Sequence, residues 1–390
     1  MRTPLWLTLL LGVLTAVGPV STDMYLPAFP ALEASLGVPA GSAQITLAAW
    51  FAGLAVGQIT QGSLSDRFGR RWPLIFGTAL YTVASAGCAL APGLLSFSVC
   101  RVLAALGGSA SMVIPRAVVR DLTDGHEAAR LFSRLMLING AVPILAPSLG
   151  GAVLAFASWR VIFWAAAVYG VACTVMVCLW MPDTLPENRR IKLGLGGIVS
   201  RYAAIARERG FVTHALVGGL GLAGLFAYLA GSPAAFIREY QVSPSHFGMF
   251  FGMNAAGFIG AAQLNARVLP ALGMGRVLSA AVRAFLCAAV ALTVDAFTHF
   301  GGLWGIMAPL FVCMASLGFV LPTATVGALS RHAAHAASAS ALLGTWQFVL
   351  GAVTGTLVGL LADGTARPMA LVMLLCAVAA AIADTWRPRR

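Results

Sequence analysis

The first acidic residue of the chain, Asp23, stands at the end of the first apolar segment. An ionised carboxylate inside a membrane costs several kcal/mol, so Asp23 is expected to exchange a proton or to meet a charged partner. Pro19 and Pro27 flank it, and each removes a helical hydrogen bond, which predicts a bend or break in the helix. The alternative is an ordinary interfacial acid just outside the bilayer, because the preceding apolar run barely reaches the ~20 residues needed to span.

A cation, Arg101, lies several residues inside the fourth apolar segment. Helical spacing places it on one face with small residues and with the thioether of Met112, which predicts a face that lines a cavity. We hypothesise that Arg101 and Asp23, which we expect at a similar depth, are electrostatically coupled. The alternative is a structural arginine that snorkels to the membrane surface.

The amino-acid composition indicates the class of protein in which Asp23 and Arg101 lie. Of the 390 residues, 59% are hydrophobic and only 10% are charged, against roughly 25% charged in soluble chains, so the sequence predicts an all-α polytopic membrane protein. The net charge of +12 is spread between apolar blocks, which argues against nucleic-acid binding. The seven cysteines show no metal-ligand spacing. We find no constellation typical of an enzyme and expect no cofactor other than protons as the coupling ion.

Twelve apolar blocks follow one another, each long enough for a helix that crosses a core of about 30 Å. Their predicted spans are Leu5–Phe29, Ser42–Gly62, Trp72–Ala91, Leu95–Val118, Leu131–Phe156, Val161–Met181, Phe211–Ile237, His246–Ala266, Val277–Phe297, Leu303–Thr325, Ala341–Leu361 and Met369–Trp386.

A polar segment at the middle of the chain separates six blocks from six. We therefore expect an N-terminal bundle at 1–181, a cytoplasmic linker at 182–210 and a C-terminal bundle at 211–390. Residues 198–209 are either a short amphipathic helix on the membrane surface or plain linker. Of the 25 basic residues, only Arg101, Arg160, Arg238 and Arg367 lie outside the segments on the side of the termini. This bias predicts that both termini are cytoplasmic.

The connection between the second and third blocks contains an ordered motif, Gly-Ser-Leu-Ser-Asp-Arg-Phe-Gly-Arg-Arg, at residues 62–71. Its glycines predict a tight turn and close helix approach, and its acid is placed to meet a helix N-terminus or a basic partner. The motif resembles the signature loop of the major facilitator superfamily, and a weaker echo without the acid follows the eighth block at 265–276. The residues expected to control the conformational change are Gly62, Asp66, Arg67, Gly69, Arg70 and Arg71.

Within that superfamily the sequence is similar to the Bcr/CflA branch of drug/proton antiporters. The resemblance rests on residues 21–27, on Arg101, on Ser-Trp-Arg at 158–160 and on Arg-Asp-Leu at 120–122. Residues 139–151 resemble the antiporter motif of exporters, with Ala146 where the fuller pattern has glycine. The resemblance implies two pseudo-symmetric six-helix bundles around a central cavity, and it adds to the gating residues Asp121, Pro147, Gly150 and Gly151.

Polar and aromatic residues in the middle of apolar blocks are candidates for contact with the transported molecule, although such aromatics more often serve packing. The predicted substrate-binding residues are Tyr25, Met112, Asn139, Phe226, Tyr228, Asn254, Trp346 and Gln347.

The leading hypothesis is proton-coupled efflux of drugs or small amphipathic metabolites across a bacterial inner membrane by a monomer embedded in lipid. An uptake symporter of the same fold is the second hypothesis. The third is a scaffold or receptor-like membrane protein that transports nothing. The efflux hypothesis assigns proton coupling to Asp23 and Arg101.

Overall fold

The computed structural model describes residues 5–123, 125–187, 190, 195–330, 332 and 336–387, and within these ranges every regular element is a helix. The long helices of the first half are α1 (Leu5–Asp23), α3 (Ser42–Phe68), α4 (Arg71–Leu90), α5 (Leu94–Leu122), α6 (Gly125–Phe156) and α7 (Arg160–Trp180). Those of the second half are α9 (Arg209–Pro233), α10 (Pro244–Leu272), α11 (Met274–Thr298), α12 (Gly302–Leu329), α13 (Ala336–Leu360) and α14 (Arg367–Thr385).

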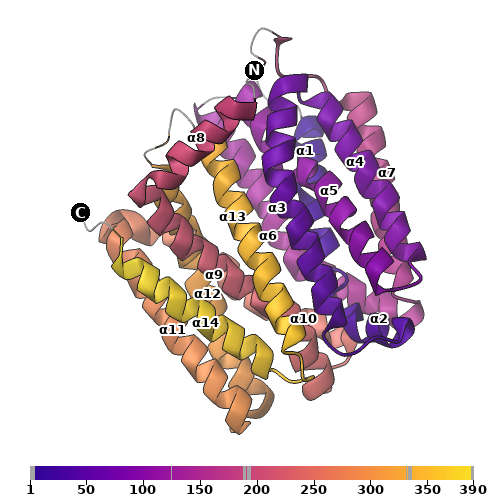
Figure 1. The fold of residues 1–390 in the computed structure, drawn as a ribbon, viewed down its shortest axis with the longest axis vertical. Coiled ribbons are helices and arrows are strands. Elements are labelled where there is room, and N and C mark those ends of the chain that lie inside the picture. Colours follow the sequence, from indigo (N-terminus) through magenta and orange to yellow (C-terminus); the bar gives the residue numbers. More distant parts are fainter. Residues whose placement is uncertain are drawn as a thin grey trace.

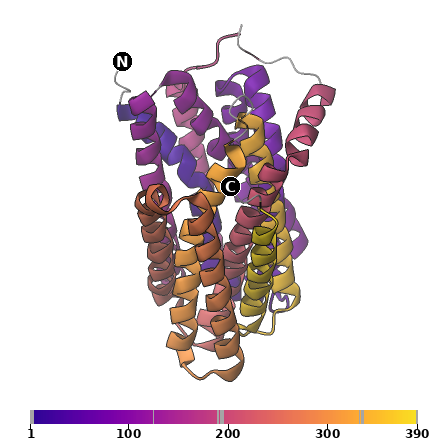
Figure 2. The ribbon, with the colours of Figure 1, turned by 90° about the vertical axis from the view of Figure 1, so that its left-hand side faces the viewer.

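These helices match the twelve predicted spans. Eleven helices in the described ranges are long and apolar enough to cross a membrane, and α6, with its apolar part Gly140–Phe156, supplies the twelfth. They form two bundles of six that lie side by side in Figure 1 and are seen from the side in Figure 2. The bundles meet where α3 packs along α13 and where α6 packs along α10.

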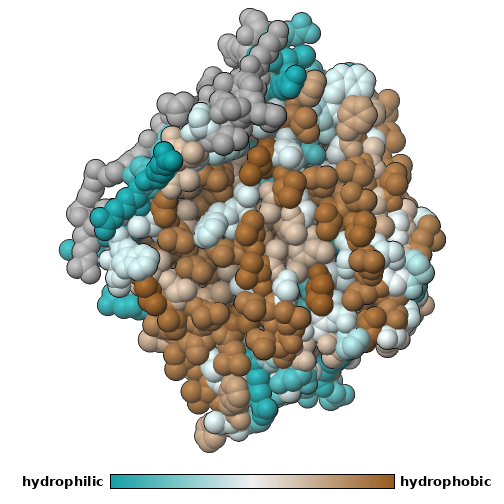
Figure 3. Space-filling model, in the orientation of Figure 1, coloured by the Kyte–Doolittle hydropathy of each residue, from teal (hydrophilic) through white to brown (hydrophobic). Residues whose placement is uncertain are grey.

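The surface of the molecule is apolar around its middle. Large hydrophobic side chains such as Leu95 (80% exposed) and Phe156 (93% exposed) point outward, and Figure 3 shows a broad apolar region with hydrophilic residues gathered toward its edges. A soluble monomer rarely exposes so large an apolar patch, whereas lipid tails match it.

The two faces at the ends of the helices differ. The termini face carries the start of α1, the end of α14 and the short helix α8 (Leu195–Arg207), all toward the upper left of Figure 1. The opposite face carries α2 (Phe29–Leu36), at the lower right. Helix α8 confirms a helical segment within the linker. Ile205 on α8 packs into a small apolar cluster with Phe211 and Leu343, so α8 is anchored to the second bundle.

The first helix of each bundle changes its geometry near the opposite face. Helix α1 ends at Asp23 and continues through a turn, the 3-10 helix η1 (Leu26–Ala28) and α2. This break agrees with the bend that Pro27 predicts, since proline donates no backbone hydrogen bond. Helix α9 ends at Pro233 and continues as a π-helix, η3 (Ala234–Glu239). The break in α1 places Asp23 at a helix end where backbone carbonyls lack intrahelical partners.

Candidate functional site

Asp23 is buried between the two bundles. Only 5% of its surface is exposed, and in the described ranges its carboxyl group has no hydrogen bond and no ion pair. An ionised carboxylate buried without a partner costs several kcal/mol, whereas a protonated one or one that meets a polar ligand costs much less. This isolation makes Asp23 the centre of the candidate site.

Arg101 reaches the end of α1 from α5 and is 2% exposed. Its Nη1 donates a hydrogen bond to the backbone carbonyl of Ser21 at 3.1 Å, one of the carbonyls that the end of α1 leaves free. Its guanidinium carbon lies 4.4 Å from the ring centroids of both Tyr25 and Trp50. Arg101 therefore holds the backbone two residues before Asp23 and forms no ion pair with it. The coupling of the two side chains stays a prediction.

Tyr25 packs inside the first bundle. It is 1% exposed, its hydroxyl pairs with Thr46 at 3.2 Å and its ring packs on Phe163. Tyr25 also positions Arg101. Contact between Tyr25 and substrate stays a prediction.

The second bundle presents two polar groups toward Asp23. Tyr228 on α9 lies near Asn254 of α10 and within electrostatic range of Asp23. The Tyr228 hydroxyl interacts with the Asn254 side chain, yet neither this hydroxyl nor the Asn254 Oδ1 has a hydrogen bond of good geometry in the described part of the chain. Asn254 donates to the Phe250 carbonyl at 3.1 Å. Buried polar atoms are almost always paired. Two such poorly satisfied polar atoms near an acid are suited to a polar ligand or water.

An aromatic stack crosses the boundary between the bundles close to these groups. The ring of Phe226 on α9 lies 4.0 Å from that of Phe51 on α3 and 5.8 Å from that of Phe348 on α13, centroid to centroid. Phe226 precedes Tyr228 by two residues, about 3 Å along the helix toward the termini face. The stack thus lies on that side of Tyr228, and contact between Phe226 and substrate stays a prediction.

Four further residues are predicted to contact substrate: Met112, Trp346, Gln347 and Asn139. Met112 packs against α1 at Gly18, where an added Cβ would lie 3.0 Å from its sulfur. Trp346 is 37% exposed, and Gln347 is half-buried. The side chain of Asn139 lies outside the described residues. For all four, contact with substrate stays a prediction.

Arg116 is a residue that the sequence reasoning missed. It is exposed to solvent although protein atoms surround it, as expected for a side chain on the wall of a recess. It has no ion pair in the described part of the chain. Arg116 follows Met112 by four residues, so it continues the face of Arg101 by one helical turn. That spacing was the signal that could have found it.

The signature loop forms a charge cluster at the termini face. Arg70 Nε donates to Asp121 at 2.7 Å, its Nη1 donates to Asp66 at 2.7 Å and to Ser65 at 2.9 Å, and its backbone N–H donates to Asp183 at 2.9 Å. Burial by itself lowers the pKa of Arg70, but the hydrogen bonds and charges of the two acids raise it above its usual value. The guanidinium therefore stays charged and joins three segments of the first bundle.

The two glycines of this loop, Gly69 and Gly62, have different surroundings. Gly69 has φ +88°, which favours glycine, and a Cβ there would collide with the Asp183 carboxylate. The close approach and turn predicted at Gly62 are wrong, because α3 continues to Phe68 and a Cβ on Gly62 would meet only Val113, at 3.9 Å.

The remaining side chains of the loop bind within the first bundle. Arg71 donates to the Cys178 carbonyl at 2.6 Å, and Arg67 lies over the ring of Phe68. Asp66 meets the basic partner expected for it, Arg70. A contact of Asp66 with the start of α13 is not formed among the described residues, and it stays a prediction for another arrangement.

Replacing Arg70 with glutamine is expected to lower the stability of the first bundle. The change leaves Asp121 and Asp66 partly buried without their cation, and breaking such a pair costs about 3 kcal/mol. We expect thermal unfolding of the purified protein to begin several degrees lower. Arg67→Gln is the matched control, because Arg67 makes only the exposed contact with Phe68, and it should leave the transition within about 1 °C. Equal transitions for the two variants would contradict the role given to Arg70.

The two glycines of the antiporter motif pack closely on backbone near the opposite face. A Cβ on Gly150 would collide with the Met24 carbonyl of the same bundle, and one on Gly151 with the Pro244 carbonyl of the second bundle. Pro147 lies inside the same helix, α6. The role of these three residues in gating stays a prediction.

A second set of contacts closes the same face. Glu33 of α2 forms an ion pair with Arg238 of the second bundle, and it also accepts the backbone N–H groups of Gly41 and Ala43 at 2.9 and 3.0 Å. A Cβ on Gly41 would collide with the Gly359 carbonyl. The bundles are therefore in tight contact at the opposite face. Neither Glu33 nor Arg238 carries a hydropathy or motif signal that marks the pair.

Comparisons with known proteins agree with this geometry. The family model of the Major Facilitator Superfamily matches residues 11–356. The chain is 35% identical over 379 residues to an uncharacterized MFS-type transporter, YdgK, of Bacillus subtilis (strain 168), covering 97% of this chain and 94% of the relative. It is 29% identical over 371 residues to a chloramphenicol resistance protein of Pseudomonas aeruginosa, covering 95% and 87%.

Two further comparisons concern the branch and the fold. A bicyclomycin resistance protein homolog of Haemophilus influenzae (strain ATCC 51907 / DSM 11121 / KW20 / Rd) is 27% identical over 375 residues, covering 96% of this chain and 94% of the relative. The crystal structure of a D-xylose-proton symporter superposes with a TM-score of 0.75, covers 98% of both chains and is 14% identical, which supports the fold alone. The resemblance to the Bcr/CflA branch is confirmed, and with two six-helix bundles, a matching signature loop and full-length relatives, this chain belongs to the major facilitator superfamily of membrane transporters.

Proposed function

We propose that the protein exports drugs or small amphipathic metabolites across the bacterial inner membrane in exchange for protons. The observation that carries the proposal is the buried carboxyl group of Asp23, which has no hydrogen bond or ion pair among the described residues and lies within electrostatic range of Tyr228. A group in such a place must bind either a proton or a ligand, and mutual exclusion of the two is the requirement for antiport.

The transport cycle uses the two bundles as rigid halves, 1–181 and 211–390, joined by the linker at 182–210. When the site opens toward the outside, Asp23 takes a proton from the more acidic side and substrate is released. The neutral acid can then be buried, which lets the halves rock until the site faces the cytoplasm. Arriving substrate favours loss of the proton, and the cycle restarts. An elementary charge moved through 100 mV supplies roughly 2.3 kcal/mol, enough for more than tenfold accumulation.

Arg101 contributes by fixing the end of α1. Its hydrogen bond to the Ser21 carbonyl and its contacts with two aromatic rings hold the backbone beside Asp23. A change in the position of Arg101 therefore changes the position of Asp23. This is a route for the predicted coupling that needs no ion pair between the two side chains.

The termini face is assigned to the cytoplasm. The excess of arginine in the segments on that side supports this orientation, since positively charged loops remain inside. Tight contact at the opposite face then corresponds to a state that is closed to the outside. We propose that the protein works as a monomer, with each chain holding a complete site.

The direction of transport is tested in inside-out membrane vesicles. On energising the vesicles, an exporter accumulates a fluorescent or radiolabelled phenicol in the lumen and dissipates the proton gradient. A symporter would instead drive the same compound out of the lumen. Absence of proton release when candidate compounds bind to detergent-solubilised protein would support a protein that transports nothing.

Loss of the ion pair at the opposite face is expected to shift the protein toward the outward-open state. Glu33→Gln or Arg238→Gln leaves one member without its partner, and a buried pair broken in this way costs about 3 kcal/mol. In a protein with Gln44→Cys, a buried position between the bundles, modification by a membrane-impermeant maleimide should accelerate at least tenfold.

Three comparisons make this measurement specific. The double variant should react no faster than either single one, because the two residues share one interaction. Glu187→Gln, which removes an 88% exposed carboxylate at the termini face, should leave the rate unchanged. If the effects of Glu33→Gln and Arg238→Gln on the maleimide reaction rate were additive, the ion pair between them would not be what holds the opposite face closed.

A further inference from the structure

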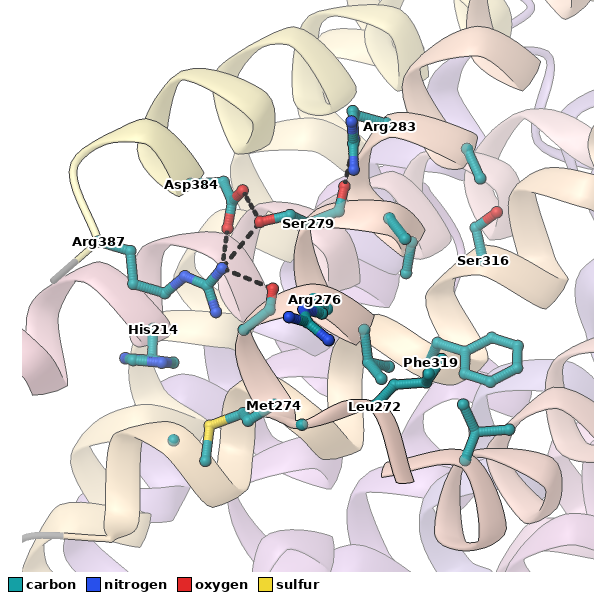
Figure 4. A pocket seen from close by; sticks show the side chains of 18 of the residues that line it. His214, Leu272, Met274, Arg276, Ser279, Arg283, Ser316, Phe319, Asp384 and Arg387 are labelled. Carbon is teal, nitrogen blue, oxygen red and sulfur yellow. Dashed lines mark hydrogen bonds and ion pairs between the residues drawn. The ribbon is translucent and has the colours of Figure 1, made fainter. Parts of the chain in front are cut away.

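A large cavity lies in the second bundle at the termini face, away from Asp23. Its volume is about 1300 Å³, and it is bounded by the start of α9, the end of α10, the first half of α11, α12 and the end of α14. Figure 4 shows it from close by. None of its lining residues belongs to the site around Asp23, and none lies on the first bundle.

The cavity is at least as deep as one leaflet of a bilayer. On α11 the lining runs from Met274 to Ala284, and on α12 and its C-cap it runs from Phe311 to Ser330. These lengths of helix rise about 15 Å and about 28 Å, against ~15 Å for one leaflet of the hydrocarbon core. The deep part is apolar, and its side is open, since Phe311 and Val312 are 42% and 46% exposed. A groove of this depth with an open apolar side is accessible to an acyl chain from the surrounding lipid.

The shallow part of the cavity is positively charged. Its lining includes three arginines and one acid, Asp384. Asp384 pairs with Arg387 at 2.9 Å, and Arg387 also donates to Ser279 Oγ at 2.9 Å and to the Gly275 carbonyl at 3.0 Å. The acid is thereby neutralised, and the other two arginines, Arg276 and Arg283, keep their charge.

These two arginines are available to a ligand. Arg276 has no ion pair or hydrogen bond in the part of the chain that the structure describes, and Figure 4 shows it between the group around Asp384 and Phe319. Arg283 donates only to the Ser279 carbonyl, at 3.1 Å, which turns its side chain toward the start of α11. Arg276 therefore lies near the shallow end of the groove, and Arg283 lies two turns further along α11 with its side chain directed back toward Ser279.

We propose that this cavity binds one anionic phospholipid. Its phosphodiester would lie between Arg276 and Arg283, because guanidinium groups bind phosphate oxygens in bidentate geometry, and one acyl chain would follow the groove past Phe319 and Ala315. Basic pockets between membrane helices suit acidic headgroups. A zwitterionic lipid would bring a second cation beside the two arginines, and a free phosphate would leave the apolar groove uncovered. The lipid holds α10, α11 and α12 together.

The test measures lipid affinity of the full-length protein by native mass spectrometry and by thermal unfolding in nanodiscs. In phosphatidylcholine nanodiscs, added phosphatidylglycerol should bind to one site and raise the unfolding temperature. The double variant Arg276→Gln/Arg283→Gln should bind phosphatidylglycerol about thirtyfold more weakly, since each arginine near acidic headgroups contributes about fivefold. Its unfolding in pure phosphatidylcholine should match the wild type, which shows that it is folded.

The control variant removes two charges from the same face of the first bundle. Arg120→Gln/Arg134→Gln, two exposed arginines outside the cavity, should keep the wild-type affinity. Ala315→Trp, which fills the groove and keeps both arginines, should also weaken binding. The proposal is overturned if both double variants bind equally, if phosphatidylcholine binds as well as phosphatidylglycerol, or if inorganic phosphate alone gives the same stabilisation.

Discussion

The variant Asp23→Asn is expected to lose all uphill transport. Asparagine keeps the shape of the side chain and cannot exchange a proton, so substrate movement is no longer linked to the proton gradient. The more than tenfold accumulation that roughly 2.3 kcal/mol per 100 mV can support should fall to none in energised inside-out vesicles. Proton release on substrate binding to the solubilised protein should disappear as well.

Two comparisons separate loss of coupling from loss of folding. Movement of substrate down its own gradient should persist in Asp23→Asn, because the neutral side chain can still be buried as the bundles rock. Asp295→Asn is the matched control: Asp295 is a second buried acid, 9% exposed, and it accepts the Gly301 N–H at 2.8 Å, a bond that asparagine can also accept. It should keep coupled transport. Uphill transport by Asp23→Asn with normal pH dependence would refute the proposed function.

The variant Gly151→Val is expected to prevent closure of the opposite face. Its Cβ would collide with the Pro244 carbonyl oxygen of the second bundle, and backbone packed against a helix cannot move aside as a flexible side chain can. Overpacking of this kind costs typically 1–3 kcal/mol, enough to move most molecules to the outward-open state. We expect transport to fall more than tenfold and a cysteine at position 44 to react with impermeant maleimide at least tenfold faster.

A glycine with free space around it supplies the comparison. Gly260 lies inside α10, and an added Cβ there meets nothing within 4 Å. Gly260→Val therefore introduces the same side chain into a helix of the same protein without a collision. It should transport normally and leave the maleimide rate unchanged. If Gly151→Val behaves like Gly260→Val, the contact between α6 and the start of α10 does not control access.

The sequence by itself determined the helices and the family, and it singled out Asp23, whose role in proton coupling remains a proposal. Twelve apolar blocks could be predicted because a lipid environment imposes a length and an apolar composition on each span. The break after Asp23 was predicted from Pro27, since the missing backbone donor acts locally. The basic partner of Asp66 in the signature loop could also be predicted, because Arg70 follows it by only four residues.

Only the tertiary structure decided which side chains meet. Tyr25 follows Asp23 by two residues and yet faces the core of the first bundle, whereas Tyr228, about 200 residues away, approaches the acid. Likewise the pair of Glu33 with Arg238 joins two bundles through residues that no local pattern connects. Hydropathy patterns and motifs indicate only local properties of one segment, such as its tendency to lie in lipid or to form a turn. Contacts between helices depend on rotation and depth, which are set by packing against the other bundle.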